Sequence, residues 1–236
     1  MSEPALAKES LKATRHRLGM HRFSAVELLI ALALLFFCLP FVEEVKGGEI
    51  IMSILLSLVL ISAVLAVSNR RRTLVVAVLL AIPTVASRWI NHFRPHLVPP
   101  AIFLVGGLLL IAFVVVHLMR FVLHAPSVNL EVLCASISAY LMLGLLWTIA
   151  YWLVAAISPT AFAFNTTTGA KESMHGFNAF YFSFVTLSTV GYGDITPVSK
   201  VARMLAAMEA MTGLLYVAVL IARLVALYST RKSHDS

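Results

Sequence analysis

The residues best suited to chemistry in this chain form one continuous run, Thr189-Val190-Gly191-Tyr192-Gly193-Asp194. Two glycines alternate with larger residues, and glycine adopts positive φ without the steric penalty that Cβ imposes. A backbone that alternates in this way aims the carbonyl oxygens of Thr189 to Tyr192, together with the Thr189 hydroxyl, toward one side. A row of oxygens can replace the water around a cation. The run therefore indicates a strand that binds a dehydrated cation.

A second chemical group stands alone further along the chain. Glu209 is the only acidic residue in the apolar run Val201–Tyr228, and an acid within a membrane is costly enough to mark a functional site by default. Either its carboxyl faces a water-filled cavity and attracts cations, or it points behind the cation-binding strand and hydrogen-bonds a neighbouring helix. The second interpretation is favoured, because a hydrogen bond offsets the cost of burial.

The composition indicates that membrane-spanning segments position these residues. Of 236 residues, 60% are hydrophobic and 12% are charged, whereas soluble domains have about 25% charged residues. Apolar runs long enough to cross a bilayer account for this imbalance, so a soluble enzyme, a disordered chain and a disulfide scaffold are excluded. Cys38 and Cys134 both lie within such runs, where free cysteine packs as a small apolar side chain. The expected spans are Ser24–Val42, Ile50–Ser68, Thr73–Ile90, Leu97–Met119, Val132–Ser158 and Val201–Tyr228.

The distribution of charge predicts the orientation. The first 23 residues are polar and basic, which argues against a cleaved signal peptide. With six spans and both termini in the cytoplasm, lysines and arginines are about twice as frequent on the cytoplasmic side, as the positive-inside rule requires. The net charge of +7 thus reflects membrane topology and does not point to nucleic acid. The third span contains Pro83 and relies on Arg88 and Trp89 reaching the membrane surface.

Between the last two spans lies a segment that breaks the pattern. Residues 159–176 are polar and turn-forming, and the aromatic stretch Phe177–Ser188 follows. A helix of that length measures roughly 18 Å, too short for a hydrocarbon core of about 30 Å. It must enter the membrane and return, and non-helical backbone at that depth is tolerated only when buried in protein or lining a water-filled path.

In the run Thr189–Asp194, preceded by a short helix and flanked by one full span on each side, the chain resembles the potassium channels. The resemblance implies an all-α membrane protein with six transmembrane helices, a re-entrant pore helix and a filter loop. It implies a homotetramer, because one chain supplies one filter strand and a ring of carbonyls needs four. Potassium would be the permeant ion, bound by Thr189, Val190, Gly191, Tyr192 and Gly193, with the bilayer as surroundings and with no other cofactor and no nucleic acid.

The same resemblance assigns filter-support positions to Asp194, Tyr181, Phe182, Val185 and Thr186. Tyr181 and Phe182 replace two tryptophans that many family members carry. The Tyr181 phenol is able to hydrogen-bond Asp194, whereas Phe182 has no donor for the Tyr192 hydroxyl, which leaves Thr186 as its candidate partner. Val185 stands where some members carry a buried carboxylate. These differences keep selectivity plausible and place filter rigidity in question.

Val201–Tyr228 resembles the inner helix of these channels. Gly213 follows Asp194 by nineteen residues, the spacing of the family's hinge glycine. A gating hinge and close helix packing are both open, and replacement by alanine is expected to act mildly. Further along the same stripe, Val217, Ile221, Ala222 and Val225 match cavity-lining and gate positions, with ordinary helix packing as the alternative.

The fourth span lacks the charges of a voltage sensor. Leu97–Met119 contains no arginine or lysine, and His117 is its only titratable side chain. The second and third spans contain no acidic residue that would pair with sensor cations. Voltage sensing requires charges that move through the membrane field, so a helical scaffold around the pore is the better interpretation.

The sequence thus predicts a passive, potassium-selective channel of the small bacterial six-span kind, in the cell membrane, and not an enzyme. The alternatives are a weakly selective cation channel and a non-conducting subunit that modulates other channel chains. The expected parts are a cytoplasmic basic tail (1–23), a four-helix domain (24–123), a pore domain (124–229) and a cytoplasmic tail (230–236). Asn165-Thr166-Thr167 is a glycosylation sequon, relevant only in a eukaryotic secretory route.

Overall fold

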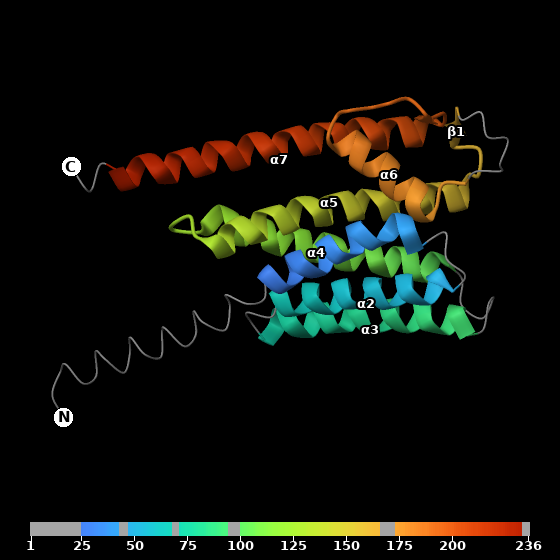
Figure 1. Ribbon diagram of the computed structural model, residues 1–236, viewed down its shortest axis with the longest axis horizontal. Coiled ribbons are helices and arrows are strands. Elements are labelled where there is room, and N and C mark those ends of the chain that lie inside the picture. Colours follow the sequence, from blue (N-terminus) through green and yellow to red (C-terminus); the bar gives the residue numbers. More distant parts are fainter. Residues whose placement is uncertain (1–24, 43–46, 68–70, 94–99, 166–172, 233–236) are drawn as a thin grey trace.

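The structure is a computed structural model that describes residues 25–42, 47–67, 71–93, 100–165 and 173–232 (Figure 1). Its elements are, in chain order, a first helix Ala25–Val42, α2 (Gly48–Val67), α3 (Arg71–Phe93), α4 (Pro100–His124), α5 (Leu130–Ile157), β1 (Phe162–Phe164), α6 (Gly176–Leu187), β2 (Ile195–Pro197) and α7 (Lys200–Lys232). All the helices except α6 are long and apolar enough to span a membrane, which makes six candidate spans. The prediction of an all-helical membrane protein with six spans is confirmed.

The third span, α3, is longer than its sequence predicts. It continues through Pro83 to Phe93. In place of the expected reach to the membrane surface, Arg88 and Trp89 point to α2: the Arg88 Nε–H donates to Ser53 Oγ at 3.1 Å, and the Trp89 Nε1–H donates to Ser57 Oγ at 3.3 Å. These bonds hold the polar end of α3 inside the bundle. The helix therefore does not require Arg88 and Trp89 to reach the membrane surface.

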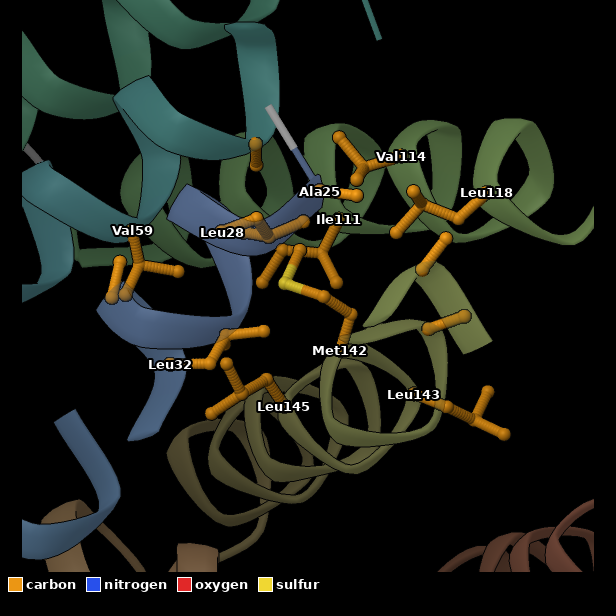
Figure 2. Close-up of a cluster of buried hydrophobic side chains, with 14 of the residues drawn as sticks. Ala25, Leu28, Leu32, Val59, Ile111, Val114, Leu118, Met142, Leu143 and Leu145 are labelled. Carbon is orange, nitrogen blue, oxygen red and sulfur yellow. The ribbon is translucent and has the colours of Figure 1, made fainter. Parts of the chain in front are cut away.

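The core lies between the first helix, α2, α4 and α5. Figure 2 shows Met142 of α5 extending toward Leu28 of the first helix and Ile111 of α4, and all three side chains are buried. Val59 of α2 joins the same cluster. The α5 helix is the centre of this packing, because 61% of its spanning segment is buried, compared with 17% for α7.

The re-entrant helix α6 lies between α5 and α7 at one end of the molecule, with α7 along the outside (Figure 1). The first helix begins, and α7 ends, at the opposite end (Figure 1). A cavity of about 910 Å³ separates part of the first four helices from α5 and the start of α6, with Arg88 and Asn91 among its polar lining residues. The first four helices therefore contact the pore helix incompletely at this end.

Residues 159–176, which the sequence describes only as turn-forming, contain a short strand, β1, that pairs with a second strand beyond the filter loop, β2. β1 pairs with β2 in an antiparallel arrangement, with Phe162 opposite Pro197 and Phe164 opposite Ile195. β2 directly follows the run Thr189–Asp194. This two-stranded sheet therefore fixes the end of the filter loop to the segment that follows α5.

Candidate ion-binding site

The filter loop begins at the C-terminal end of α6. The α6 helix ends at Leu187, and the backbone then reverses while its N–H groups return to carbonyls of the last helical turn. The Thr189 N–H donates to Thr186 O at 2.9 Å, and the Val190 N–H donates to Val185 O at 3.0 Å. A helix C-terminus carries partial negative charge, so a cation near this loop is favoured electrostatically.

The backbone of the loop alternates as the sequence predicts, and the alternation starts earlier than expected. The φ angles are +59° at Thr189, +57° at Gly191 and +82° at Gly193, and they are not positive at Val190 and Tyr192. A Cβ at either glycine would meet nothing within 4 Å, so these positions require glycine for its conformation and not for space. Thr189 is β-branched and rarely adopts positive φ, which indicates local strain.

Tyr192 and Asp194 rest against Tyr181 of α6. The rings of Tyr192 and Tyr181 are stacked, with centroids 6.5 Å apart and planes 5° from parallel. A side-chain hydrogen bond to Asp194 is the main cause that raises the pKa of Tyr181 to about 12, with burial as the next cause. The Asp194 Oδ1 also accepts from the Ile195 N–H at 3.0 Å. Tyr181 therefore connects the pore helix to two residues at the end of the filter loop, Tyr192 and Asp194.

The remaining support residues act differently from the sequence-based expectation. Among the residues that the structure describes, no hydrogen bond joins Thr186 to the Tyr192 hydroxyl, and Thr186 and Val185 support the loop through their backbone carbonyls. Phe182 faces away from the filter: its ring packs edge-on against Tyr151 at 4.9 Å and Phe162 at 5.6 Å. Adjacent helical positions differ by about 100° in direction, and Tyr181 and Phe182 accordingly point to different neighbours.

Asn165 is a support that the sequence analysis missed. Its side-chain Nδ2–H donates to Gly193 O at 2.9 Å, and its backbone N–H donates to Asp194 O at 2.7 Å. The residue directly follows β1, which holds it beside the filter loop through the pairing with β2. Its sequon was the only signal in the sequence, and that signal pointed to a different role.

Glu209 lies behind the loop and not in an open cavity. Its side chain is fully buried, and Ser183 Oγ of α6 lies 2.5 Å from Glu209 Oε1. The Tyr151 hydroxyl of α5 donates to the other carboxyl oxygen, Oε2. Of the two interpretations that the sequence left open, the structure therefore has the one in which Glu209 bonds the pore helix. Ser183 and Tyr151 were not anticipated.

Two glycines allow α6 to lie close to both neighbouring helices. A Cβ on Gly213 of α7 would lie 2.2 Å from the Leu187 carbonyl oxygen, and a Cβ on Gly144 of α5 would lie 2.2 Å from the Phe184 ring. The α7 helix is continuous through Gly213. Gly213 therefore permits the close packing of α7 against α6 in this structure.

The inner-helix positions named from the sequence share one property. Val217, Ile221, Ala222 and Val225 are all exposed in the single subunit. The opposite side of α7 is bonded to other elements: the Tyr216 hydroxyl donates to Ser136 O at 2.5 Å, and an Arg223 Nη2–H donates to Ala125 O at 3.0 Å. These two bonds orient the helix, so the exposed stripe faces away from α5.

No cluster of three or more histidine, cysteine, aspartate or glutamate side chains is found within the described segments. The backbone and hydroxyl oxygens of the filter loop are groups that can replace the water around a cation. Tyr181, Val185 and Asn165 contact that loop directly, and Glu209 bonds the pore helix behind it.

Comparison with known proteins agrees with this geometry. A family model described as ion channel matches residues 140–230, which extend from α5 through the filter loop into α7. Over 58 residues the chain is 52% identical to the voltage-gated potassium channel Kch of Escherichia coli (strain K12), an alignment that covers 21% of this chain and 14% of that protein. Over 48 residues it is 46% identical to two-pore potassium channel 4 of Arabidopsis thaliana, with 20% and 17% covered.

The chain thus spans less than a fifth of the length of these two curated relatives. No solved structure matches the chain at a significant level. The family match includes the filter loop, its pore helix and Glu209 together. Residues 140–230 therefore form a pore domain of the ion channel family, which is a family of channels and not of enzymes, within an all-helical membrane protein with six candidate spans.

Proposed function

We propose that this protein is a potassium-selective channel that conducts K⁺ passively across the cell membrane. The observation that carries the proposal is the alternating backbone at Thr189, Gly191 and Gly193 directly after a re-entrant helix. Carbonyl oxygens in such a row replace the hydration shell of K⁺. Similarity to two potassium channels over about a fifth of the chain supports this choice of ion.

The functional unit is a homotetramer. One strand surrounds an ion on one side only, and in the single subunit the filter loop is open, with Tyr192 71% exposed. The spanning segment of α7 is mostly unburied, and its exposed apolar residues include Met204, Leu214 and Ile221. Further copies of the same chain, arranged around the filter, would cover both surfaces.

The orientation follows from the positive-inside rule, with both termini in the cytoplasm. The filter loop then opens toward the outside, because it lies at the end of the molecule opposite the start of the first helix and the end of α7 (Figure 1). The membrane is that of the cell, and we expect it to be a bacterial inner membrane.

The test is ion flux through purified protein in liposomes, under a potassium gradient with sodium as the competing ion. A current that reverses near the potassium equilibrium potential is expected. The variant Tyr192→Asp loses the ring that stacks on Tyr181 and should discriminate less between K⁺ and Na⁺. The matched control Tyr192→Phe keeps the ring and should behave like the wild type. The absence of flux from intact tetramers would contradict the proposal and favour a non-conducting modulatory subunit.

A weakly selective cation channel is the second candidate. It is favoured by the aromatic support of the filter, because Phe182 packs against α5 and β1 and leaves Tyr181 as the stacking partner of Tyr192. A single aromatic neighbour restrains the filter diameter less than a continuous aromatic ring does. In the liposome experiment, a current that reverses near zero would identify this function.

A further inference from the structure

The carboxyl group of Glu209 connects three helices at one buried point. It is fully buried, and its two oxygens contact the hydroxyls of Tyr151 on α5 and Ser183 on α6. The Ser183 Oγ in turn lies 2.8 Å from Gly144 O, again on α5. Outer helix, pore helix and inner helix therefore meet through one carboxyl group behind the filter.

The number of protons in this cluster constrains the charge of Glu209. The Ser183 hydroxyl has one hydrogen, yet its oxygen lies 2.8 Å from Gly144 O and 2.5 Å from Glu209 Oε1. Two oxygens at such separations repel each other unless a hydrogen lies between them. The Gly144 carbonyl cannot donate, so the Ser183 hydrogen belongs to that contact. The contact with Glu209 then needs a second hydrogen, which only the carboxyl group can supply.

The electrostatic surroundings agree with an uncharged acid. On α5 the facing titratable groups are the phenols of Tyr151 and Tyr140, and on α6 the facing group is the Ser183 hydroxyl. The next cation on α7, Arg203, donates from Nε to Pro197 O at 3.1 Å at the exposed end of that helix. Burial of an ionised carboxylate without a cation is far more costly than burial of the neutral acid.

We propose that Glu209 functions as a protonated, uncharged acid that positions the pore helix, and that its ionisation releases the pore helix and closes the conduction path. The carboxyl O–H donates to Ser183 Oγ, while the carbonyl oxygen accepts from the Tyr151 hydroxyl. On ionisation the proton passes to water, and the carboxylate repels the Ser183 oxygen whose hydrogen is bound to Gly144 O. This inference rests on the proposed channel function and adds a positioning residue to it.

Infrared spectroscopy of the full-length protein in liposomes tests the charge directly. A protonated carboxyl group has a C=O stretching band that an ionised one lacks. The wild type should show this band at neutral pH, and Glu209→Gln should remove it. The matched variant Glu131→Gln, at the first turn of α5, should leave it in place. A spectrum that Glu209→Gln leaves unchanged would overturn the proposal, and this readout does not depend on conduction.

Potassium flux tests the positioning role. Glutamine reproduces a neutral acid, because its amide donates and accepts at the same positions. Glu209→Gln should therefore conduct within about twofold of the wild type, whereas Glu209→Ala, which leaves buried hydroxyls unpaired, should lose about tenfold or more. The potassium flux of Ser183→Ala should lie between the fluxes of these two variants. Equal loss in the glutamine and alanine variants would show that the charged form is required and would overturn the proposal.

The pH profile tests the release. Wild-type flux should fall as the pH rises through the ionisation of Glu209, and Glu209→Gln should lack this alkaline decline while it retains every tyrosine. A decline that persists unchanged in Glu209→Gln would contradict the release step. If the wild type conducts no ion at all, the proposed channel function fails, and the infrared band still decides the charge of Glu209.

Discussion

Asn165 shows how one side chain outside the family signature can control the filter loop. Its amide donates to Gly193 O at 2.9 Å, while its backbone bond to Asp194 O is independent of the side chain. Asn165→Ala should therefore keep the β1–β2 pairing and lose one hydrogen bond. The expected cost is about 1 kcal/mol, which corresponds to a reduction in potassium flux of roughly fivefold.

The control for this prediction is Asn178→Ala, which removes an amide bond to Ser173 O at the start of α6, away from the filter. Flux measured in liposomes should separate the two variants. If Asn165→Ala and Asn178→Ala conducted equally well, the filter loop would not depend on Asn165.

The raised pKa of Tyr181 leads to a prediction about pH. The pKa is raised from 10.0 to about 12, first by the hydrogen bond to Asp194 and then by burial. A raised pKa means that the protonated phenol is stabilised in the folded state, so its contribution is complete below pH 10 and is lost as the pH rises through about 12. The tie between Tyr181 and Asp194 should thus persist at all physiological pH values.

Ultraviolet titration of tyrosinate measures this effect. The difference between wild type and Tyr181→Phe should isolate one phenol that ionises near pH 12, and Asp194→Asn should move that phenol toward its ordinary value. A Tyr181 phenol that titrates at the same pH in wild type and Asp194→Asn would show that Asp194 is not its partner.

At the scale of the elements, α6 is held between α5 and α7 by glycines, and this arrangement reverses the expectation that Gly213→Ala is mild. Alanine in a helix interior is favoured over glycine by about 1 kcal/mol. A Cβ at Gly213, however, would lie 2.2 Å from the backbone oxygen of Leu187, which has no side-chain freedom to move. Overpacking of this kind costs typically about 1–3 kcal/mol, so the clash outweighs the helix preference.

A graded series of glycine-to-alanine variants tests this packing. Gly213→Ala should reduce stability and flux most, and Gly144→Ala should follow, because the Phe184 ring that it meets at 2.2 Å is able to move. Gly107→Ala is the control, since its Cβ would meet the end of the Ile149 side chain at 3.2 Å. Thermal unfolding and potassium flux provide the measurements. A Gly213→Ala channel as stable and active as Gly107→Ala would contradict the close approach of α7 to α6.

At the scale of the whole molecule, we expect that the four helices before the pore do not sense voltage steeply. One charge that crosses the membrane field is worth about 2.3 kcal/mol per 100 mV, and α4 carries no arginine or lysine between Pro99 and Met119. Arg120 is exposed in the last turns of α4. If it crossed a tenth of the field, the coupling would be about 0.2 kcal/mol per subunit, which is below thermal energy.

Open probability should therefore vary only shallowly with membrane potential. Single-channel recordings from about −100 to +100 mV, repeated with different permeant ions, separate protein charges from ions that move within the filter. Steep activation that persists when the ions are changed would reveal a sensor in the protein. Arg88 is restrained against this role by Ser53 and by the Phe103 ring, 5.5 Å from its guanidinium carbon, and Arg94 lies outside the described residues.

The architecture could be predicted because it depends on local patterns. Long apolar runs specify spans, a stretch as short as Phe177–Ser188 cannot cross a bilayer, and glycine alternation around Tyr192 specifies the backbone of a filter. Each of these signals lies within one contiguous segment. The predicted spans, the pore helix and the positive φ angles of Gly191 and Gly193 are accordingly found in the structure.

Only the tertiary structure decided how the filter is supported. The contacts that support it join residues far apart in the sequence. Asn165 meets Gly193 through the pairing of β1 with β2. Ser183 meets Glu209, and Gly213 meets Leu187, because α6 and α7 pack in one particular rotation and register. The sequence allowed Glu209 to face either a cavity or the pore helix, and it allowed Gly213 to be either a hinge or a contact. A helix presents a new direction every 100°, so such choices depend on the neighbouring helices and not on the order of residues along the chain.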